Sequence, residues 1–126
     1  MASRLKVYFD GGCRPNPGAM ELAVVAAGQT WLERDAGPGT STDAEWLALL
    51  YALRIAQALG ATDFVLLGDA AAVIGAATGA VRCRGAGLRH MAELHRLVGA
   101  GNLPRIRYIR RSQNLAGIAL ARLHPR

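Results

Sequence analysis

The sequence contains little that would cross-link the chain or anchor it in a membrane. It has two cysteines, Cys13 and Cys83, which lie far apart and show no metal-type spacing. Two isolated cysteines fit a reducing cytoplasm at least as well as one disulfide. The longest uncharged run near the middle, residues 70–81, is only 12 residues long, too short to cross a bilayer. No long apolar segment follows the first charges, so we expect no secretion signal, no membrane association and a cytoplasmic protein.

Acids are almost absent from the last third of the chain. Residues 82–126 contain ten arginines and a single acid, Glu93, a net charge of +9, whereas residues 1–81 contain five basic and eight acidic side chains, a net charge of −3. This asymmetry favours a polyanionic partner such as a nucleic acid. The alternative is a soluble basic surface from an arginine-favouring genome, since 14 of the 15 basic residues are arginine.

The sequence shows no internal repeat and no low-complexity linker. Hydrophobic residues make up 52% and charged residues 19% of the 126 residues, which excludes a disordered chain. This length is enough to bury one core. We therefore expect a single domain over residues 1–126, acting as a monomer.

Hydrophobic periodicity predicts five strands and four helices. The strands are "LKVYFD" (5–10), "MELAVVAAG" (20–28), "QTWLERDA" (29–36), "DFVLLGD" (63–69) and "RIRYIR" (105–110), and the helices cover residues 43–59, 70–79, 87–101 and 114–123. The apolar run 63–69 is typical of a central strand buried on both faces. The order of elements predicts an α/β fold, with a three-strand antiparallel meander on one edge of a five-stranded mixed sheet, parallel strands beyond it and crossover helices.

Three acids stand at structurally distinctive positions, and each has a plainer interpretation. Asp10 ends the first strand, where Asp-Gly is also a common turn pair. Glu45 lies in the first turn of the long helix, where "TDAE" matches a capping box starting at Thr42. Asp69 ends the buried strand, where it could be only the N-cap of the next helix.

The predicted topology unites these acids. If the first and fourth strands are parallel neighbours, Asp10 and Asp69 lie side by side at the carboxyl edge, where open α/β sheets bind ligands. Gathered carboxylates repel one another unless cations lie between them. Oxygen ligands suit Mg²⁺ or Mn²⁺. An acidic metal site beside a basic half indicates phosphodiester cleavage or phosphoryl transfer.

Four segments, in order, resemble the type 1 ribonuclease H family, which cuts the RNA strand of RNA/DNA hybrids. They are "YFDGGCRPNPG" (8–18), "TSTDAEWLALLYAL" (40–53), "VLLGDAAAVIGAATG" (65–79) and "IRYIRRSQNLAGIALARL" (106–123). The resemblance implies the ribonuclease H-like fold with helices on both faces of the sheet. It also implies that Asp10, Glu45 and Asp69 are catalytic metal ligands for Mg²⁺ or Mn²⁺.

The same resemblance implies a set of contacts to the hybrid. They come from the loop after the first strand, the start of the long helix and the arginines before the third helix: Gly11, Cys13, Asn16, Ser41, Thr42, Arg82 and Arg84. Together with Arg89, these arginines would partly replace a basic insertion that some members use to grip the hybrid.

The chain departs from the family at several positions. The family carries a fourth acid four residues after Asn114, and this chain has Ile118 there, with no acid anywhere after Glu93. At the two positions before the glutamate where the family carries paired asparagines, this chain has Ser41 and Thr42. Two functions stay open: a metal-dependent endoribonuclease with reduced activity, and a catalytically impaired nucleic-acid-binding module. A third alternative, a partner-binding domain without nucleic acid, conflicts with the charge of the second half.

The remaining aromatic and imidazole side chains receive no role in this interpretation. We expect His90 and His95 to be polar surface residues on the third helix and His124, near the end of the chain, to be mobile. Trp31 and Trp46 are expected to pack in the core or at its edge rather than to stack on bases.

Overall fold

The computed structural model describes residues 4–124, so the predicted domain of residues 1–126 extends beyond the described part at both ends. The strands are β1 (Leu5–Cys13), β2 (Gly18–Ala26), β3 (Gln29–Glu33), β4 (Pro38–Gly39), β5 (Phe64–Gly68) and β6 (Arg105–Tyr108). The helices are α1 (Ser41–Ala58), α2 (Ala71–Ala77), α3 (Gly87–Val98) and α4 (Leu115–Ala121), and η1 (Arg111–Gln113) is a 3-10 turn. No helix within residues 4–124 is long and apolar enough to cross a membrane.

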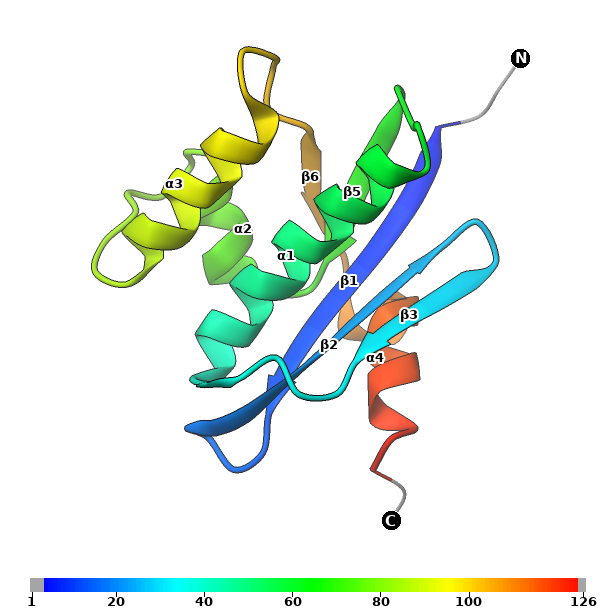
Figure 1. The fold of residues 1–126 in the computed structure, drawn as a ribbon, viewed down its shortest axis with the longest axis vertical. Coiled ribbons are helices and arrows are strands. Elements are labelled where there is room, and N and C mark those ends of the chain that lie inside the picture. The colour runs from blue at the N-terminus through cyan, green and yellow to red at the C-terminus, as the bar shows by residue number, and fades with distance from the viewer. Residues whose placement is uncertain (1–3, 125–126) are drawn as a thin grey trace.

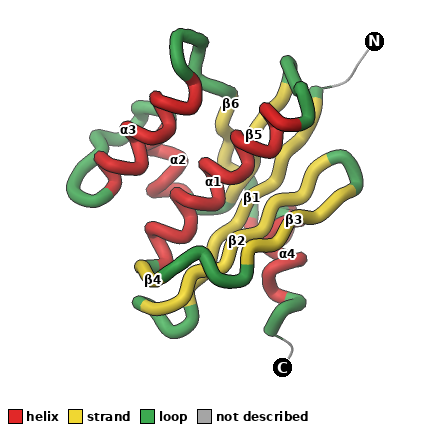
Figure 2. Tube along the Cα trace, viewed as in Figure 1, coloured by secondary structure: helices red, strands yellow, loops and turns green. Residues whose placement is uncertain are grey.

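The strands form one mixed sheet, as predicted (Figure 2). The order is β3-β2-β1-β5-β6, and the two-residue strand β4, which was not predicted, pairs with β2. β1, β2 and β3 form an antiparallel meander, whereas β5 is parallel to both β1 and β6. The predicted parallel pairing of the first and fourth long strands is therefore confirmed.

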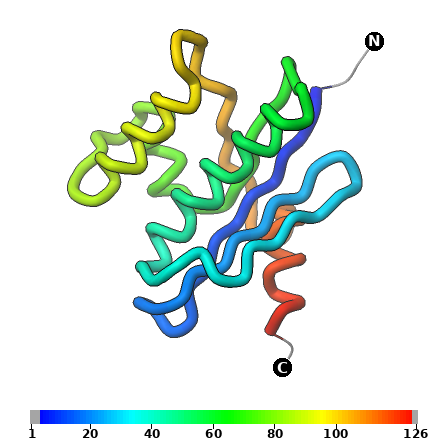
Figure 3. The backbone as a smooth tube through the Cα atoms, viewed as in Figure 1, coloured from blue at the N-terminus to red at the C-terminus, as the bar shows by residue number. Residues whose placement is uncertain are grey.

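Helices cover both faces of the sheet, which confirms the predicted layers (Figure 1). The main core lies between the sheet and α1, with α2 and α3 beside it, and contains Val7 and Phe9 from alternate positions of β1. On the opposite face, α4 packs against β1 and β2 through a smaller cluster of Ala23, Ala116 and Leu120. Helix α4, near the end of the chain, thus packs against β1, near its beginning (Figure 3).

Strand β1 is longer than predicted. It continues through Asp10 to Cys13 because Gly11, Gly12 and Cys13 keep pairing with β2. Its pairing with β5 stops earlier, at Tyr8 and Leu67. The expectation that the strand ends at Asp10 is therefore wrong. Asp10 lies where one neighbouring strand has ended and the other continues, which leaves room beside its side chain.

Helix α1 begins two residues earlier than predicted. Its N-cap is Thr40, whose hydroxyl accepts a hydrogen bond from the Asp43 backbone N–H at 3.1 Å. The Asp43 carboxylate accepts the Thr40 backbone N–H at 3.2 Å, so these two residues form the capping box. The predicted box between Thr42 and Glu45 is wrong. This leaves the Glu45 carboxylate without a capping role.

Candidate metal centre

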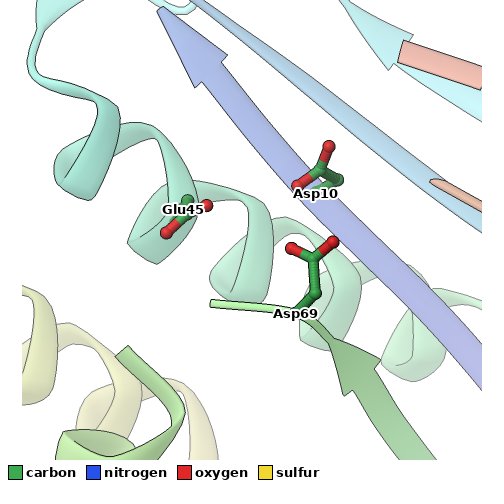
Figure 4. A group of neighbouring side chains, drawn as sticks. All are labelled: Asp10, Glu45 and Asp69. Carbon is green, nitrogen blue, oxygen red and sulfur yellow. The ribbon is translucent and has the colours of Figure 1, made fainter. Parts of the chain in front are cut away.

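Three carboxylates from three separate elements meet at one edge of the sheet. Asp10 comes from β1, Glu45 from the second turn of α1, and Asp69 directly follows β5. One carboxylate oxygen of each lies within 4.8 Å of those of the other two. Figure 4 shows their side chains turned toward a common point. Among the described residues, these three acids form the one group of at least three side chains that could bind a metal ion together.

The parallel pairing of β1 and β5 explains why the two aspartates are neighbours. Tyr8 pairs with Leu67, so Asp10 and Asp69 each lie two residues beyond this last pair. Neither aspartate serves the plainer role considered for it. Asp10 lies inside a strand rather than in a turn. The N-cap of α2 is Ala70, and no side chain caps that helix.

Glu45 reaches this edge because β1 and α1 approach each other unusually closely. A Cβ atom added to Gly11 would lie 2.1 Å from the backbone oxygen of Ala44 and 2.8 Å from the backbone nitrogen of Glu45. Any side chain at Gly11 would therefore separate the helix from the strand. The predicted site residue Gly11 is buried, and its contribution is to let α1 carry Glu45 toward Asp10.

Burial and mutual repulsion perturb the acids. The pKa of Asp10 is raised from 3.8 to about 7, mainly by burial and then by the charge of Asp69, against opposing effects of Arg111 and the Gly11 backbone N–H. The pKa of Glu45 is raised from 4.5 to about 7, mainly by burial and then by the two aspartates, again opposed by Arg111. The cluster therefore holds protons near neutral pH unless a cation compensates its charge.

The basic side chain of Arg111 lies beside the acids. The Arg111 Nε atom is 3.9 Å from an Asp69 carboxylate oxygen, but the arginine side chain is 93% exposed. A pair this long and this exposed contributes little stabilisation. Arg111 thus offsets only part of the negative charge and leaves the acids able to bind a cation.

The donor set fits a hard divalent cation. Three carboxylates offer only oxygen ligands, and their perturbed pKa values show that the site favours added positive charge. Mg²⁺ and Mn²⁺ prefer this kind of site and keep further positions for water and substrate phosphate. Asp10, Glu45 and Asp69 would hold such an ion.

The acids open into a cleft of about 370 Å³ between β1, β2, α1 and α4. Gly117 of α4 lies next to Asp10, since a Cβ atom on it would be 3.4 Å from the Asp10 Oδ2 atom. The following residue, Ile118, lines the cleft and is 42% exposed. Ile118 therefore faces the site rather than the core. The resemblance implies that the family places its fourth acid at this position.

The predicted substrate-contacting residues at the start of α1 form a connected group. The Asn16 side-chain amide donates to Ser41 Oγ at 3.0 Å, and its oxygen accepts the Ser41 backbone N–H at 3.0 Å. The Cys13 thiol is half-buried and contacts the backbone oxygens of Pro15 and Gly39 at 3.0 and 3.1 Å. Thr42 is exposed. Asn16 thus fixes the loop after β1 against α1, and its contact with substrate stays a prediction.

The predicted basic contacts lie outside the cleft. Arg82 and Arg84 are exposed in the connection between α2 and α3. This connection packs near α1, because a Cβ atom on Gly87 would lie 3.1 Å from Cys83 Sγ and 3.6 Å from Trp46 Nε1. The two arginines therefore flank the end of α1 that carries Glu45 without reaching the acids.

Two histidines contact residues that are distant in the sequence. His90 is half-buried, lies 2.9 Å from an Asp43 carboxylate oxygen and stacks on Trp46, with ring centroids 5.8 Å apart. The Nε2 atom of His124 lies 2.6 Å from a Glu21 carboxylate oxygen, and the expected mobility of this residue stays a prediction. Both partners are distant in sequence, so local patterns gave no signal for these pairs. His95 is exposed as predicted.

Trp46 is buried, as predicted for a core residue, and Trp31 is half-buried at its edge. The cleft also contains polar side chains that the sequence interpretation did not assign to the site: Arg14, Glu21, Arg111 and His124. A lone acid in the apolar run "MELAVVA" was the available signal for Glu21.

Comparison with known proteins gives one family and a consistent set of structures. The family model described as reverse transcriptase-like matches residues 10–124. No curated protein matches the chain in sequence. Ribonuclease H1 from the halophilic archaeon Halobacterium salinarum is similar in structure, with 29% identity, a TM-score of 0.82 and coverage of 94% of each chain.

Two further solved structures share the fold at lower identity. The N-terminal ribonuclease H domain of a Mycobacterium tuberculosis protein is 23% identical with a TM-score of 0.76, and the match covers 98% of this chain and all of that one. A ribonuclease H1 in complex with an RNA/DNA hybrid is 21% identical with a TM-score of 0.81, and the match covers 93% of each chain. At this identity the likeness establishes the fold.

Proposed function

We propose that this chain, which belongs to the reverse transcriptase-like family and resembles type 1 ribonuclease H in fold, cuts the RNA strand of RNA/DNA hybrids with a bound divalent cation. The observation that supports this proposal best is the gathering of Asp10, Glu45 and Asp69 within 4.8 Å. The similar structure with a bound hybrid supports the same substrate class.

The chemistry would be hydrolysis of a phosphodiester. Water attacks the phosphorus, a new P–O bond forms, and the bond to the leaving 3′ oxygen breaks. A bound Mg²⁺ or Mn²⁺ would supply charge stabilisation of the phosphoryl oxygens and activation of water. The protein's own part is to fix three carboxylates, from β1, from α1 and from the residue after β5, around one point, so that little reorganisation is needed during the reaction.

The substrate would lie over the cleft and the adjacent end of α1. Asn16, Ser41 and the exposed Thr42 lie at that end and offer amide and hydroxyl groups. Arg82 and Arg84 flank it and offer charge for phosphates. We propose the roles of these residues, and of Gly11 and Cys13, on this placement.

Ile118 supports a second candidate function. With an isoleucine on the cleft wall and three acids in reach, the site has one carboxylate fewer than the resemblance implies. The activity would then be reduced, or the protein would bind hybrids without cutting them. Fold alone does not separate these functions.

A cleavage assay tests the proposal. Labelled RNA/DNA hybrid and matched RNA and DNA duplexes are incubated with the protein and Mg²⁺ or Mn²⁺. We expect cleavage of the hybrid's RNA strand, none with EDTA, and none for a folded Asp10→Asn variant. Binding without cutting under either metal would overturn the enzyme and support the binding module.

The proposed setting is a reducing cytoplasm, with the protein acting as a monomer. Cys13 and Cys83 are both free thiols in the structure, which supports such a compartment. Gel filtration with light scattering measures the oligomeric state.

A further inference from the structure

A paired carboxylate and imidazole lie in the same cleft as the three acids. The Nε2 atom of His124 is 2.6 Å from an Oε atom of Glu21, and their side chains are only 28% and 14% exposed. Both residues line the cleft that contains Asp10, Glu45 and Asp69. The capping and packing contacts described above do not use this pair.

The fold holds both members of the pair in place. Glu21 lies opposite Gly12 in the antiparallel ladder, so it projects from the same face of the sheet as Asp10. Asp10 pairs with Ala23, which makes Glu21 its diagonal neighbour, and such neighbours lie roughly 7–8 Å apart. Both residues line the cleft of about 370 Å³, which has room for water beside the pair and the acids.

His124 is anchored by the end of α4. It follows α4, and its backbone N–H donates to the Ala121 carbonyl oxygen at 3.1 Å. The preceding Leu123 packs against the small cluster between α4 and the sheet. The imidazole therefore has a fixed backbone and a fixed partner, which is what an oriented base requires.

The charged and titratable groups that share the cleft with His124 leave it a distinct chemical role. They are Asp10, Glu45, Asp69, Arg14, Arg111 and Glu21. Three of these acids would hold the cation, so their oxygens would be engaged, and arginine does not accept protons. Among the described residues His124 is the only histidine in the cleft, and a histidine is suited to proton transfer near neutral pH.

The neighbouring wall of α4 gives this role a place in the reaction. Ile118 and Leu120 line the cleft there, so this wall offers water no carboxylate. A water molecule in the cleft beside this wall lacks an acid from α4 to polarise it. The pair of Glu21 and His124 is the polar group next to this apolar stretch.

We propose that Glu21 and His124 act as a dyad that removes the proton from the attacking water. Glu21 accepts the Nε2–H of His124 and fixes the tautomer, which leaves Nδ1 with a free lone pair. As the water oxygen bonds to phosphorus and the 3′ oxygen leaves, the water's proton passes to Nδ1. The leaving oxygen takes a proton from solvent, and His124 later returns its own. This inference rests on the proposed ribonuclease function.

Kinetics of matched variants test the dyad. His124→Gln, which keeps a hydrogen-bonding side chain, and Glu21→Gln are compared with His95→Ala, a change at an exposed histidine of α3. We expect His124→Gln to lower kcat by about 10²-fold with KM within about twofold, since loss of a general base typically costs this much or more. Glu21→Gln should lower kcat less, and the control should leave it unchanged.

A pH profile separates catalysis from structural support. Between about pH 5 and pH 8, the rise of kcat that a histidine base produces should be lost in His124→Gln. Added imidazole should partly restore cleavage by His124→Ala. Circular dichroism and calorimetric Mg²⁺ titration show whether each variant folds and keeps the metal centre.

Two results would overturn the dyad. In the first, the wild-type protein cuts hybrids, and His124→Gln or Glu21→Gln keeps the wild-type kcat and pH profile. The pair would then only connect α4 to β2, and the proposed ribonuclease function would stand. In the other, the wild-type protein cuts nothing, and the dyad falls together with the proposed function.

Discussion

The side-chain amide of Asn114 donates a hydrogen bond of 3.0 Å to the backbone carbonyl oxygen of Phe9, the residue before Asp10. The same side chain caps α4 by accepting the Ala116 backbone N–H at 3.1 Å. Asn114 is fully buried. One residue therefore fixes the start of the last helix against the strand that carries the first acid of the metal centre.

Asn114→Ala should lower the free energy of unfolding by about 2–4 kcal/mol. The change removes a helix cap, worth about 1 kcal/mol, and leaves a buried carbonyl without its partner, at about 1–3 kcal/mol. Urea denaturation measures this loss. Asn102→Ala, at an exposed position, is the matched control and should change stability by less than about 0.5 kcal/mol. Equal effects would show that the bond to Phe9 contributes nothing.

Gly11→Ala should damage the metal centre, whereas Gly12→Ala should not. A Cβ atom at Gly11 meets the Ala44 backbone at 2.1 Å, and backbone cannot move aside cheaply. At Gly12 the nearest atom is a flexible Leu120 methyl at 3.4 Å. Overpacking of this kind typically costs about 1–3 kcal/mol or more. Thermal unfolding and calorimetric Mg²⁺ titration of both variants check the difference. Similar metal affinities would contradict the close approach of β1 and α1.

The sequence predicted those parts of the fold that local patterns determine. Strand β5 was expected at residues 63–69 and spans Phe64–Gly68, because a short run buried on both faces has a distinctive composition. The start of α1 was missed by two residues, since Thr40, Ser41 and Thr42 are all suitable caps. Two interactions select Thr40: the return bond from Asp43 and the bond from Asn16, 25 residues away, to Ser41.

The candidate site also contains residues that sequence patterns predicted and residues that only distant contacts bring together. Asp10 and Asp69 follow from strand register, so topology alone predicted that they would be neighbours. Glu21 and His124 were missed because their contact spans 103 residues and depends on how α4 lies across the sheet. Side-chain pairs of this kind leave no local pattern in the sequence, because only the tertiary packing of α4 brings them together.

Without metal, the protein should lose stability as the pH rises from about 4 to about 7. Asp10 and Glu45 have pKa values of about 7 in the folded state, against 3.8 and 4.5 ordinarily. In this range the folded state binds more protons than the unfolded state, so the stability from neutral carboxyls is full below about pH 4 and lost through pH 7. Melting temperatures in EDTA measure this trend.

Asp10→Asn is the control for that trend, because it removes one of the two raised pKa values and the charge that helps to raise the other. Its melting temperature should fall less over the same pH range. Adding Mg²⁺ at pH 7 should stabilise the wild-type protein more than the variant. If the melting temperatures of the two proteins depend on pH in the same way, repulsion among these acids does not destabilise the folded protein.

Binding of a duplex should weaken steeply with salt, since phosphate contacts release counterions. Each contact contributes a slope of roughly −0.9 on a log–log plot for B-form DNA. Replacing Arg82, Arg84 and Arg89 with Ala should flatten that slope, because all three are exposed, two in the connection before α3 and one in its first turn. Fluorescence anisotropy in the Asp10→Asn background measures it. Arg34→Ala, at an exposed position directly after β3, is the control. An unchanged slope in the triple variant would contradict the proposed footprint.

Ile118→Asp should convert the cleft wall into a fourth ligand. Ile118 is 42% exposed and lines the cleft, next to a residue whose backbone approaches Asp10. Little apolar contact is lost on substitution, so the cost in EDTA comes mainly from added repulsion among carboxylates, and the melting temperature should fall. With Mg²⁺ the effect on stability should reverse, because an acid at this position can bind a cation.

We expect tighter Mg²⁺ binding and faster hybrid cleavage by Ile118→Asp, measured by calorimetry and a parallel cleavage assay. Ile118→Asn, which matches the shape without the charge, should show neither gain. An Ile118→Asp protein that folds but keeps the parent's metal affinity and activity would show that this wall of α4 plays no part in metal binding.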